Sequence, residues 1–356
     1  MDVDAYDLRK PTTGETDLAR LKQGQLRAQF WSIFVPGEIK EGYAKVQLEQ
    51  FDIAKRMIAK YPEAMELALS VSDVRRIAAK GKVASMLGME GGHVLENSLG
   101  ALRAYYDLGA RYLTLTHNVT LDWADSSMDA PRHHGLTPFG KEVVREMNRL
   151  GMLVDISHVS PDVMRDVLDT SAAPVIFSHS SAYALADHPR NVPDAILKRM
   201  AANGGVVMVT FIPPFVNRDA MAWDAGLRLQ SKGIAEEAEL KRLEDAYIKE
   251  HGPSPKATLK DVADHIDYVA RIAGHDHVGI ASDFWGGTMP VGLEDVSKYP
   301  DLFAELIRRG WSDTNLKKLA SENMLRTFEQ AERVAKRLQK ERPASTATIA
   351  TLDGKK

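Results

Sequence analysis

Cysteine is absent from this chain of 356 residues. Its absence excludes disulfide bonds, thiolate ligands for a metal ion and cysteine nucleophiles. Any bound metal must therefore be held by His, Asp and Glu side chains. An excess of either charge is also lacking, because 46 Lys and Arg residues face 49 Asp and Glu residues for a net charge of −3. We therefore expect no binding to nucleic acid and no electrostatic attachment to an anionic membrane.

Long apolar runs are missing as well. No stretch of about 18 apolar residues occurs, so we expect no membrane span. The first residues, MDVDAYDLRK, lack the basic start and the apolar core of a signal peptide, which indicates a cytoplasmic protein. The composition, 44% hydrophobic and 27% charged, is that of an ordinary globular protein. The length suits one large α/β domain or two of ordinary size.

The sequence does contain seven short runs rich in Val, Ile, Leu and aromatic residues. Their near-continuous apolarity is typical of parallel strands that are buried on both faces. Helix-capping pairs, such as Thr137-Pro138 and Ser160-Pro161, open segments between them, so strand and helix alternate. No glycine-rich phosphate loop follows the first run, which disfavours a doubly wound sheet. We predict an α/β fold, a (β/α)8 TIM-like barrel lacking one strand, with runs at 29–35, 82–89, 111–116, 153–157, 174–178, 205–211 and 277–282.

The domain organisation follows from the same pattern. We expect a single barrel domain over residues 1–341 and a flexible tail over 342–356. An insertion over about 212–260 interrupts the rhythm and includes a highly charged helical stretch near 235–250. A solvated surface helix is the favoured interpretation of this stretch, and a lid or a subunit contact is the alternative.

Five of the seven runs end on a side chain that can bind a metal or transfer a proton. The carboxyl ends of the strands form the active site in a β/α barrel. A single strand-end His is more often a structural residue, but five ionisable groups on one rim are costly unless a cation or a substrate neutralises them. Two carboxylates and three imidazoles suit Zn²⁺ or a similar divalent ion, and a bridging carboxylate would give a two-metal hydrolytic centre. These residues are Glu90, His117, His158, His179 and Asp283.

Other patterns are weaker candidates. His275 and His277 precede their strand, so they are expected at the opposite rim. His265 and Asp267 lie two residues apart in a helical segment and diverge by about 200° around its axis. Arg190 lies in a loop at the same rim as the five candidates. It is either a surface or capping residue or a fork for a substrate carboxylate, and its spacing does not decide between these roles.

Several long motifs follow one another in a fixed order over about residues 29–333. Together they resemble the renal, or membrane, dipeptidase family of zinc peptidases. The resemblance implies a β/α barrel with a two-zinc site that cleaves dipeptides, often with a D-residue at the C-terminal position, and it allows a homodimer. The motifs are GMEGGH (88–93), RYLTLTHN (111–118), WADS (123–126), GLTPFGKEVVREMNRLGMLVDISHVS (135–160), APVIFSHSSAYALADHPRNVPD (173–194), GIASDFWG (279–286) and GLEDVSKYPDL (292–302).

The resemblance also implies roles for single residues. Glu90 would bridge the two metals, and His158 with His179 would hold one of them. Asp283 would contact the other metal or its water and carry a proton to the leaving amine. In the same way, His117 would stabilise the oxyanion. Arg190 would bind the terminal carboxylate of the dipeptide.

The N-terminal region departs from the family pattern. The family's first strand carries an H-x-D pair that supplies two metal ligands, whereas no His precedes His93 here. We therefore expect a weak or empty second metal site and open edges on the first and last strands. A truncated sequence explains the missing pair more simply than an inactive homologue, and a periplasmic or secreted location is then possible. Asp2 and Asp4 are poor substitutes for the missing ligands.

Two other functions stay open at this point. One is a barrel metallohydrolase that acts on another amide or on a lactone. The other is an inactive homologue that keeps one metal and binds peptides, which the missing H-x-D pair would explain.

Overall fold

The computed structural model describes residues 3–37, 39, 42–231, 234, 236–285 and 287–354. Asp2 and the side chain of Asp4, considered above as substitute ligands, lie outside what is described. Within the described residues, no helix combines the length and the apolar character that crossing a bilayer requires.

A curled parallel sheet forms the centre of the fold, as predicted. Its main strands pair in sequence order, and each of the seven apolar runs overlaps one of them. A further short strand, β2 (Met65–Leu67), pairs with the start of β3 and was not predicted. The main strands are β1 (Ala28–Phe34), β3 (Val83–Glu90), β4 (Ala110–Thr114), β5 (Leu153–Asp155), β6 (Ile176–Phe177), β7 (Val206–Thr210) and β8 (Val278–Ala281).

The sheet does not close into a full barrel. Over the described ranges, β8 pairs with β7 and β1 pairs with β3, but β8 and β1 do not pair with each other. The outer edges of both strands are therefore open, as the sequence led us to expect.

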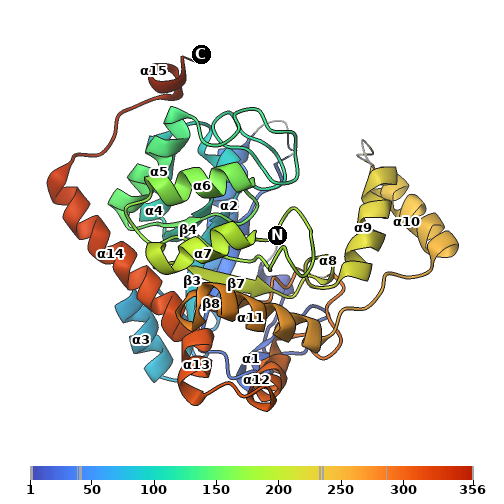
Figure 1. Cartoon of the computed structure of the whole chain (residues 1–356). Coiled ribbons are helices and arrows are strands. Elements are labelled where there is room, and N and C mark those ends of the chain that lie inside the picture. Colours follow the sequence, from blue (N-terminus) through green and yellow to red (C-terminus); the bar gives the residue numbers. More distant parts are fainter. Residues whose placement is uncertain are drawn as a thin grey trace.

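Helices surround the sheet, as Figure 1 shows. Their starts follow the sequence signals: Thr137 and Ser160 each cap a helix whose first residue is proline. Short 3-10 turns cover Val3–Ala5, Gly92–Leu95, His275–His277 and Val296–Lys298, and a π turn covers Lys318–Glu322. The α-helices are α1 (Leu18–Gln23), α2 (Tyr43–Lys60), α3 (Val71–Ala79), α4 (Leu99–Asp107), α5 (Pro138–Leu150), α6 (Pro161–Thr170), α7 (Asp194–Asn203), α8 (Pro213–Val216), α9 (Arg218–Ser231), α10 (Glu237–His251), α11 (Leu259–Ala273), α12 (Tyr299–Arg308), α13 (Asp313–Lys317), α14 (Asn323–Glu341) and α15 (Ile349–Asp353).

The alternation of side chains along the strands builds two apolar cores. Ala84 and Met86 of β3 pack with Tyr112 of β4 in a cluster that continues to α3 and α14. Leu87 and Met89, at the alternate positions of β3, belong to the larger cluster that contains the apolar faces of helices such as α5. The inner positions near the carboxyl end of the sheet are polar, which is where the predicted site residues begin.

The pairing register brings the carboxyl ends of neighbouring strands to one level. Glu90 at the end of β3 pairs with Phe34 on one side and with Thr114 on the other. Thr114 in turn pairs with Asp155 at the end of β5. Side chains that follow these positions therefore gather at a common rim.

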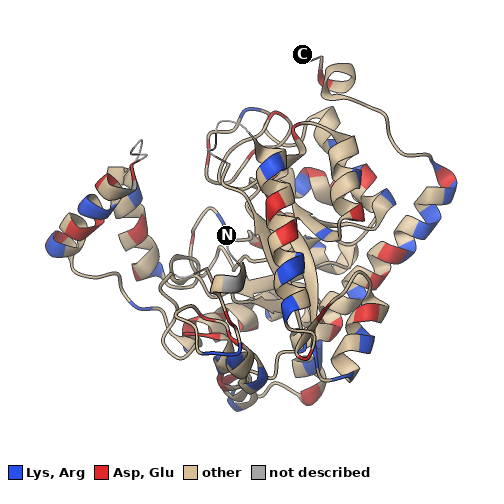
Figure 2. Ribbon diagram, turned by 180° about the vertical axis from the view of Figure 1, so that it is seen from behind, with Lys and Arg blue, Asp and Glu red and all other residues tan. Residues whose placement is uncertain are grey.

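The insertion after β7 forms a pair of helices, α9 and α10, that projects from the body (Figure 1). Trp223 and Tyr247 join the two helices through an edge-on ring contact at 5.2 Å. Most of α10 is exposed, and Tyr247 is its one buried residue among those described. Figure 2 shows Lys and Arg interspersed with Asp and Glu along this hairpin and along α14. The charged stretch of the insertion thus forms a helix most of whose residues are exposed.

The C-terminal segment, expected to form a tail, contacts the outer surface of the fold. Its helix α15 lies beside α5, and the Asp353 carboxylate accepts a hydrogen bond from the backbone N–H of Phe139 at 2.9 Å. The guanidinium of Arg103 donates to the carbonyl of Ser345 at 3.0 Å.

Candidate metal centre

Three predicted ligands from three strands converge at the carboxyl rim. Oε1 of Glu90 lies 3.1 Å from Nε2 of His158 and 3.2 Å from Nε2 of His179. The two Nε2 atoms lie 2.9 Å apart. One carboxylate oxygen and two imidazole nitrogens thus face a common point.

His117 adjoins this group. Its ring centre lies 4.4 Å from that of His158 and 4.8 Å from that of Phe34. Ligand atoms of Glu90, His117 and His158 lie within 4.8 Å of one another. His117 is therefore placed either to bind a metal with the other residues or to touch a molecule bound by it.

Electrostatics set the charges of the three converging groups. Burial raises the pKa of Glu90, but the adjacent His158 and His179 rings outweigh burial and hold this pKa well below its usual range. Burial and the nearby Arg190 charge lower the pKa of His158, which keeps its ring neutral. Burial also opposes the charged form of His179, yet Asp283 and Glu90 outweigh it and raise the pKa of that ring. A carboxylate beside imidazoles is a donor set that suits zinc.

Asp283 follows the end of β8 and interacts electrostatically with Glu90 and His179. Burial and the Glu90 charge raise the pKa of its carboxyl group, against the effects of His179 and Arg190. Its backbone has φ of 55° and that of His158 has φ of 67°, in the left-handed region that non-glycine residues seldom adopt. Such conformations concentrate at functional sites, where the surrounding structure compensates their cost.

Arg190 is a buried cation close to the same rim. It is 2% exposed, and no described carboxylate lies within ion-pair distance of its guanidinium. Its Nη2 donates to the carbonyl of His179 at 3.3 Å and its Nη1 to Ser180 at 3.4 Å, while Nε has no hydrogen-bond partner among the described residues. Burial lowers the pKa of Arg190 to about 10. A buried charge of this kind is costly without an anionic partner, so the site suits a carboxylate ligand.

The structure adds polar residues that the sequence pattern did not single out. Ser32 of β1 donates to Oε2 of Glu90 at 3.1 Å. Asp155 and Ser178 lie behind His179 and form a chain of hydrogen bonds to its ring. A signal for Asp155 did exist, because an acidic residue interrupts the otherwise apolar run LVDI at an inward-facing position.

The weaker candidates of the sequence lie outside the cluster around Glu90. His277 precedes β8, and its Nδ1 bonds to the carbonyl of Gly205 at 2.8 Å. His265 lies on α11, where its Nδ1 accepts a hydrogen bond from the Ala182 N–H at 3.0 Å. Neither residue joins the cluster around Glu90 among the described residues.

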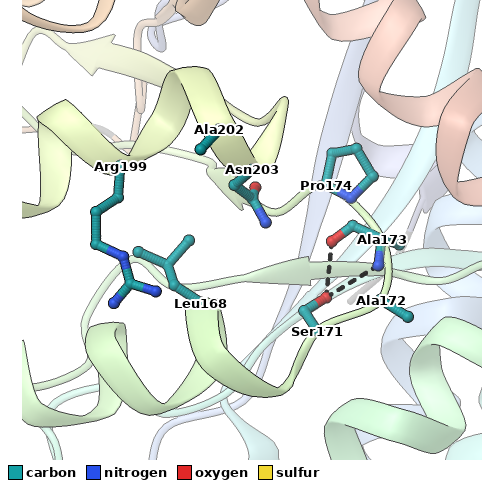
Figure 3. Close-up of a pocket in the computed structure, with 8 residues that line it drawn as sticks. All are labelled: Leu168, Ser171, Ala172, Ala173, Pro174, Arg199, Ala202 and Asn203. Carbon is teal, nitrogen blue, oxygen red and sulfur yellow. Dashed lines mark hydrogen bonds between the residues drawn. The ribbon is translucent and has the colours of Figure 1, made fainter.

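A cavity of about 330 Å³ lies at the amino end of β6, the end opposite to His179. Figure 3 shows its lining, in which Ser171 is hydrogen-bonded to the backbone of Ala173. Arg199, the one charged lining residue, already pairs with Asp169 at 2.5 Å. The charged lining residue of this cavity is therefore already paired, and the cavity lies at the rim opposite to the cluster around Glu90.

Comparison with known proteins identifies the family. A family model described as membrane dipeptidase (peptidase family M19) matches residues 1–342. The chain belongs to the membrane dipeptidase family. The expected family and its metallopeptidase class are confirmed.

Several known peptidases resemble this membrane dipeptidase family member in sequence and in fold. Dipeptidase tcpJ of Claviceps purpurea (strain 20.1) is 41% identical over 345 residues, which cover 93% of this chain and 73% of tcpJ. The probable dipeptidase PvdM from Pseudomonas aeruginosa superposes with a TM-score of 0.84 at 29% identity, over 94% of both chains. A metallopeptidase from Rhodobacter sphaeroides, solved with a phosphinate mimic of the dipeptide L-Ala-D-Ala, gives a TM-score of 0.75 at 25% identity, over 90% of this chain and 91% of that one. The predicted barrel-type fold is thereby confirmed.

Proposed function

We propose that this membrane dipeptidase family member carries out zinc-dependent hydrolysis of dipeptides, with Glu90, His158 and His179 as zinc ligands. The convergence of one carboxylate oxygen and two imidazole nitrogens, within 3.2 Å of each other, carries this proposal. When bound there, zinc supplies Lewis acidity that activates water and polarises the peptide carbonyl.

A second zinc is proposed to bind more weakly. Besides Glu90, which both ions would share, Asp283 is the remaining strand-end carboxylate for the second zinc. His117 lies near Glu90 and His158. Carboxylates and water alone hold zinc poorly, because zinc in proteins favours imidazole and thiolate ligands. The two zinc ions that the family resemblance implies therefore bind this chain with unequal affinity.

Arg190 is proposed to bind the terminal carboxylate of the substrate. Its guanidinium is buried at the rim without an acidic partner among the described residues, and a carboxylate satisfies it with two parallel hydrogen bonds. A fixed cation near the reaction centre limits the distance between the scissile bond and the terminal carboxylate. The site therefore favours dipeptides over longer peptides.

Asp283 and His117 are proposed to act on the reacting atoms. Burial and Glu90 raise the pKa of Asp283, so its carboxyl group can take a proton from water and pass it to the leaving amine. His117 stacks beside His158 and can donate a hydrogen bond to the oxygen on which negative charge develops. The solved relative with an L-Ala-D-Ala mimic supports testing a D-residue at the C-terminal position.

The substrate test compares four compounds with the zinc-loaded protein: L-Ala-L-Ala, L-Ala-D-Ala, the amide of L-Ala-L-Ala, and a tripeptide. We expect hydrolysis of the dipeptides and a kcat/KM for the amide that is lower by about 10 to 100-fold, since it lacks the carboxylate for Arg190. A β-lactam and a lactone are assayed alongside. Preference for either of these would favour a different metallohydrolase, and binding of dipeptides without turnover would indicate an inactive homologue.

A further inference from the structure

Asp155 is a buried carboxylate beneath the metal centre, outside the proposed ligand set. It is fully buried at the end of β5. Oδ1 accepts hydrogen bonds from the backbone N–H groups of Ser157 at 3.0 Å and Ser178 at 2.8 Å. Oδ2 accepts from the hydroxyls of Thr114 and Ser178, both at 2.5 Å. Four donors from three strand ends therefore surround one carboxylate.

This arrangement determines which atom donates in the hydrogen bond between Ser178 and His179. A serine hydroxyl has one hydrogen, and that of Ser178 is committed to Asp155. Ser178 Oγ also lies 2.8 Å from Nδ1 of His179. The hydroxyl can only accept in this second bond, so Nδ1 of His179 must carry a hydrogen.

We propose that Asp155 is a positioning residue that acts through Ser178 to fix His179 in its Nδ1–H tautomer. The Nε2 lone pair of His179, on the side of the ring where Glu90 lies, is then available to a metal ion. Nε2 is the atom that lies 3.2 Å from Oε1 of Glu90. A hydrogen bond to the nitrogen that does not bind the metal orients a histidine ligand and raises its basicity, and its loss commonly weakens metal binding by about 10 to 100-fold. The inference rests on the proposed metal centre but not on the identity of the substrate.

The contact between His158 and His179 agrees with a hydrogen on Nδ1 of His179. The two Nε2 atoms lie 2.9 Å apart, which leaves room for one hydrogen between them. With His179 protonated on Nδ1, His158 is the donor in the metal-free protein. His158 Nδ1 has no hydrogen-bond partner in the described part of the chain, so its tautomer is free to change when a metal arrives. The tautomer of His179 is therefore fixed by a hydrogen bond, whereas that of His158 is not.

Asp155→Asn tests the direction of the chain of hydrogen bonds. The amide oxygen must face the N–H groups of Ser157 and Ser178, since these groups can only donate, and this turns the amide NH₂ toward the two hydroxyls. Ser178 then accepts from the amide, and its own hydrogen becomes available to donate to Nδ1 of His179. The hydrogen of His179 moves to Nε2, the atom that would bind the metal.

The first measurement is ¹⁵N NMR of the histidines in the metal-free protein at alkaline pH, where the imidazoles are neutral. We expect His179 as the Nδ1–H tautomer in the wild type and as the Nε2–H tautomer in Asp155→Asn. The second is zinc affinity by competition with a chelating dye. We expect a loss of about 10 to 100-fold in Asp155→Asn and of about 10-fold in Ser178→Ala, which removes the acceptor for Nδ1 of His179 and one donor to Asp155.

Thr114→Val is the matched control, because it removes a hydrogen bond to the same carboxylate oxygen without touching the bonds between Asp155, Ser178 and His179. We expect its zinc affinity to stay within about threefold of the wild type. An unchanged tautomer in Asp155→Asn, or equal losses in all three variants, overturns the inference. If the zinc-loaded wild type hydrolyses no dipeptide while these shifts occur, the proposed function fails and the positioning role stands.

Discussion

Ser32 of β1 lies diagonally across from Glu90 of β3, and Ser32 Oγ donates to Oε2 of Glu90 at 3.1 Å. The other oxygen of Glu90 faces both imidazoles. The two oxygens thus have different partners, and β1 orients a carboxylate that β3 supplies. We predict that Ser32→Ala lowers kcat/KM for a dipeptide by about 3 to 10-fold, the equivalent of one modest hydrogen bond. Steady-state kinetics check this, and an unchanged value would remove Ser32 from the account.

Arg190→Lys separates recognition of the substrate carboxylate from chemistry. Lysine keeps the charge but cannot form two parallel hydrogen bonds, so we expect KM for a dipeptide to rise by about 10-fold or more while kcat changes less. The dipeptide amide serves as the control, since it has no carboxylate to lose. An equal penalty on both substrates would mean that Arg190 acts only by supporting the loop.

His265 gives a prediction for stability against pH. Burial lowers its pKa to about 4 from an ordinary value of 6.5, so the unfolded chain takes up a proton at a pH where the folded chain does not. Stability from this residue is therefore lost as pH falls from 6.5 toward 4, by about 3 kcal/mol in total.

His265→Asn is the variant for this test, because its Oδ1 can still accept the Ala182 N–H that Nδ1 accepts now. Urea unfolding at a series of pH values gives the unfolding free energy of each protein. Between pH 6.5 and 4 it should change less with pH in the variant than in the wild type. Parallel curves for the two proteins would show that His265 does not contribute.

Gly88 and Tyr112 are paired in neighbouring strands, and the tyrosine ring fills the space that a side chain at Gly88 would take. A Cβ there would lie 2.0 Å from the ring. We expect Gly88→Ala to cost about 1 to 3 kcal/mol of unfolding free energy, because the ring cannot move within a packed interior. Combining it with Tyr112→Ala, a change that opens this space, should cost less than the sum of the two single changes. Strict additivity would contradict the steric explanation.

Asp353 provides a test of the C-terminal contact. Its carboxylate accepts the hydrogen bond from the N–H of Phe139 in the first turn of α5. We expect Asp353→Ala to lower the unfolding free energy by about 1 kcal/mol, as for the loss of a helix cap, and Asp353→Asn to cost less because an amide oxygen still accepts. Equal stability of all three proteins would indicate that the segment adds nothing to the fold.

The sequence predicted the parts of the structure that depend on local patterns. Each apolar run overlapped a strand. Because strand ends meet at one rim, Glu90, His158 and His179 could be expected to gather before their distances were known. Strand β2 was missed because its three residues, Met65–Leu67, are too few to form a recognisable run.

The hydrogen bonds behind the site were not predictable in the same way. Asp155 depends on hydroxyls of Thr114 and Ser178, which come from other strands and become its partners only through the register. The contact of the C-terminal segment with α5 was missed for a similar reason. Its small polar residues show no periodicity, and their position depends on single hydrogen bonds such as that of Asp353.

The most direct test of the metal centre is the zinc dependence of L-Ala-L-Ala hydrolysis after removal of metal with a chelator. We predict that the wild-type protein loses activity and regains it when zinc is restored, whereas Glu90→Gln and His179→Ala recover less than about 1% of the wild-type rate under the same zinc concentration. Full activity in the metal-free protein, or wild-type recovery by His179→Ala, would contradict the account.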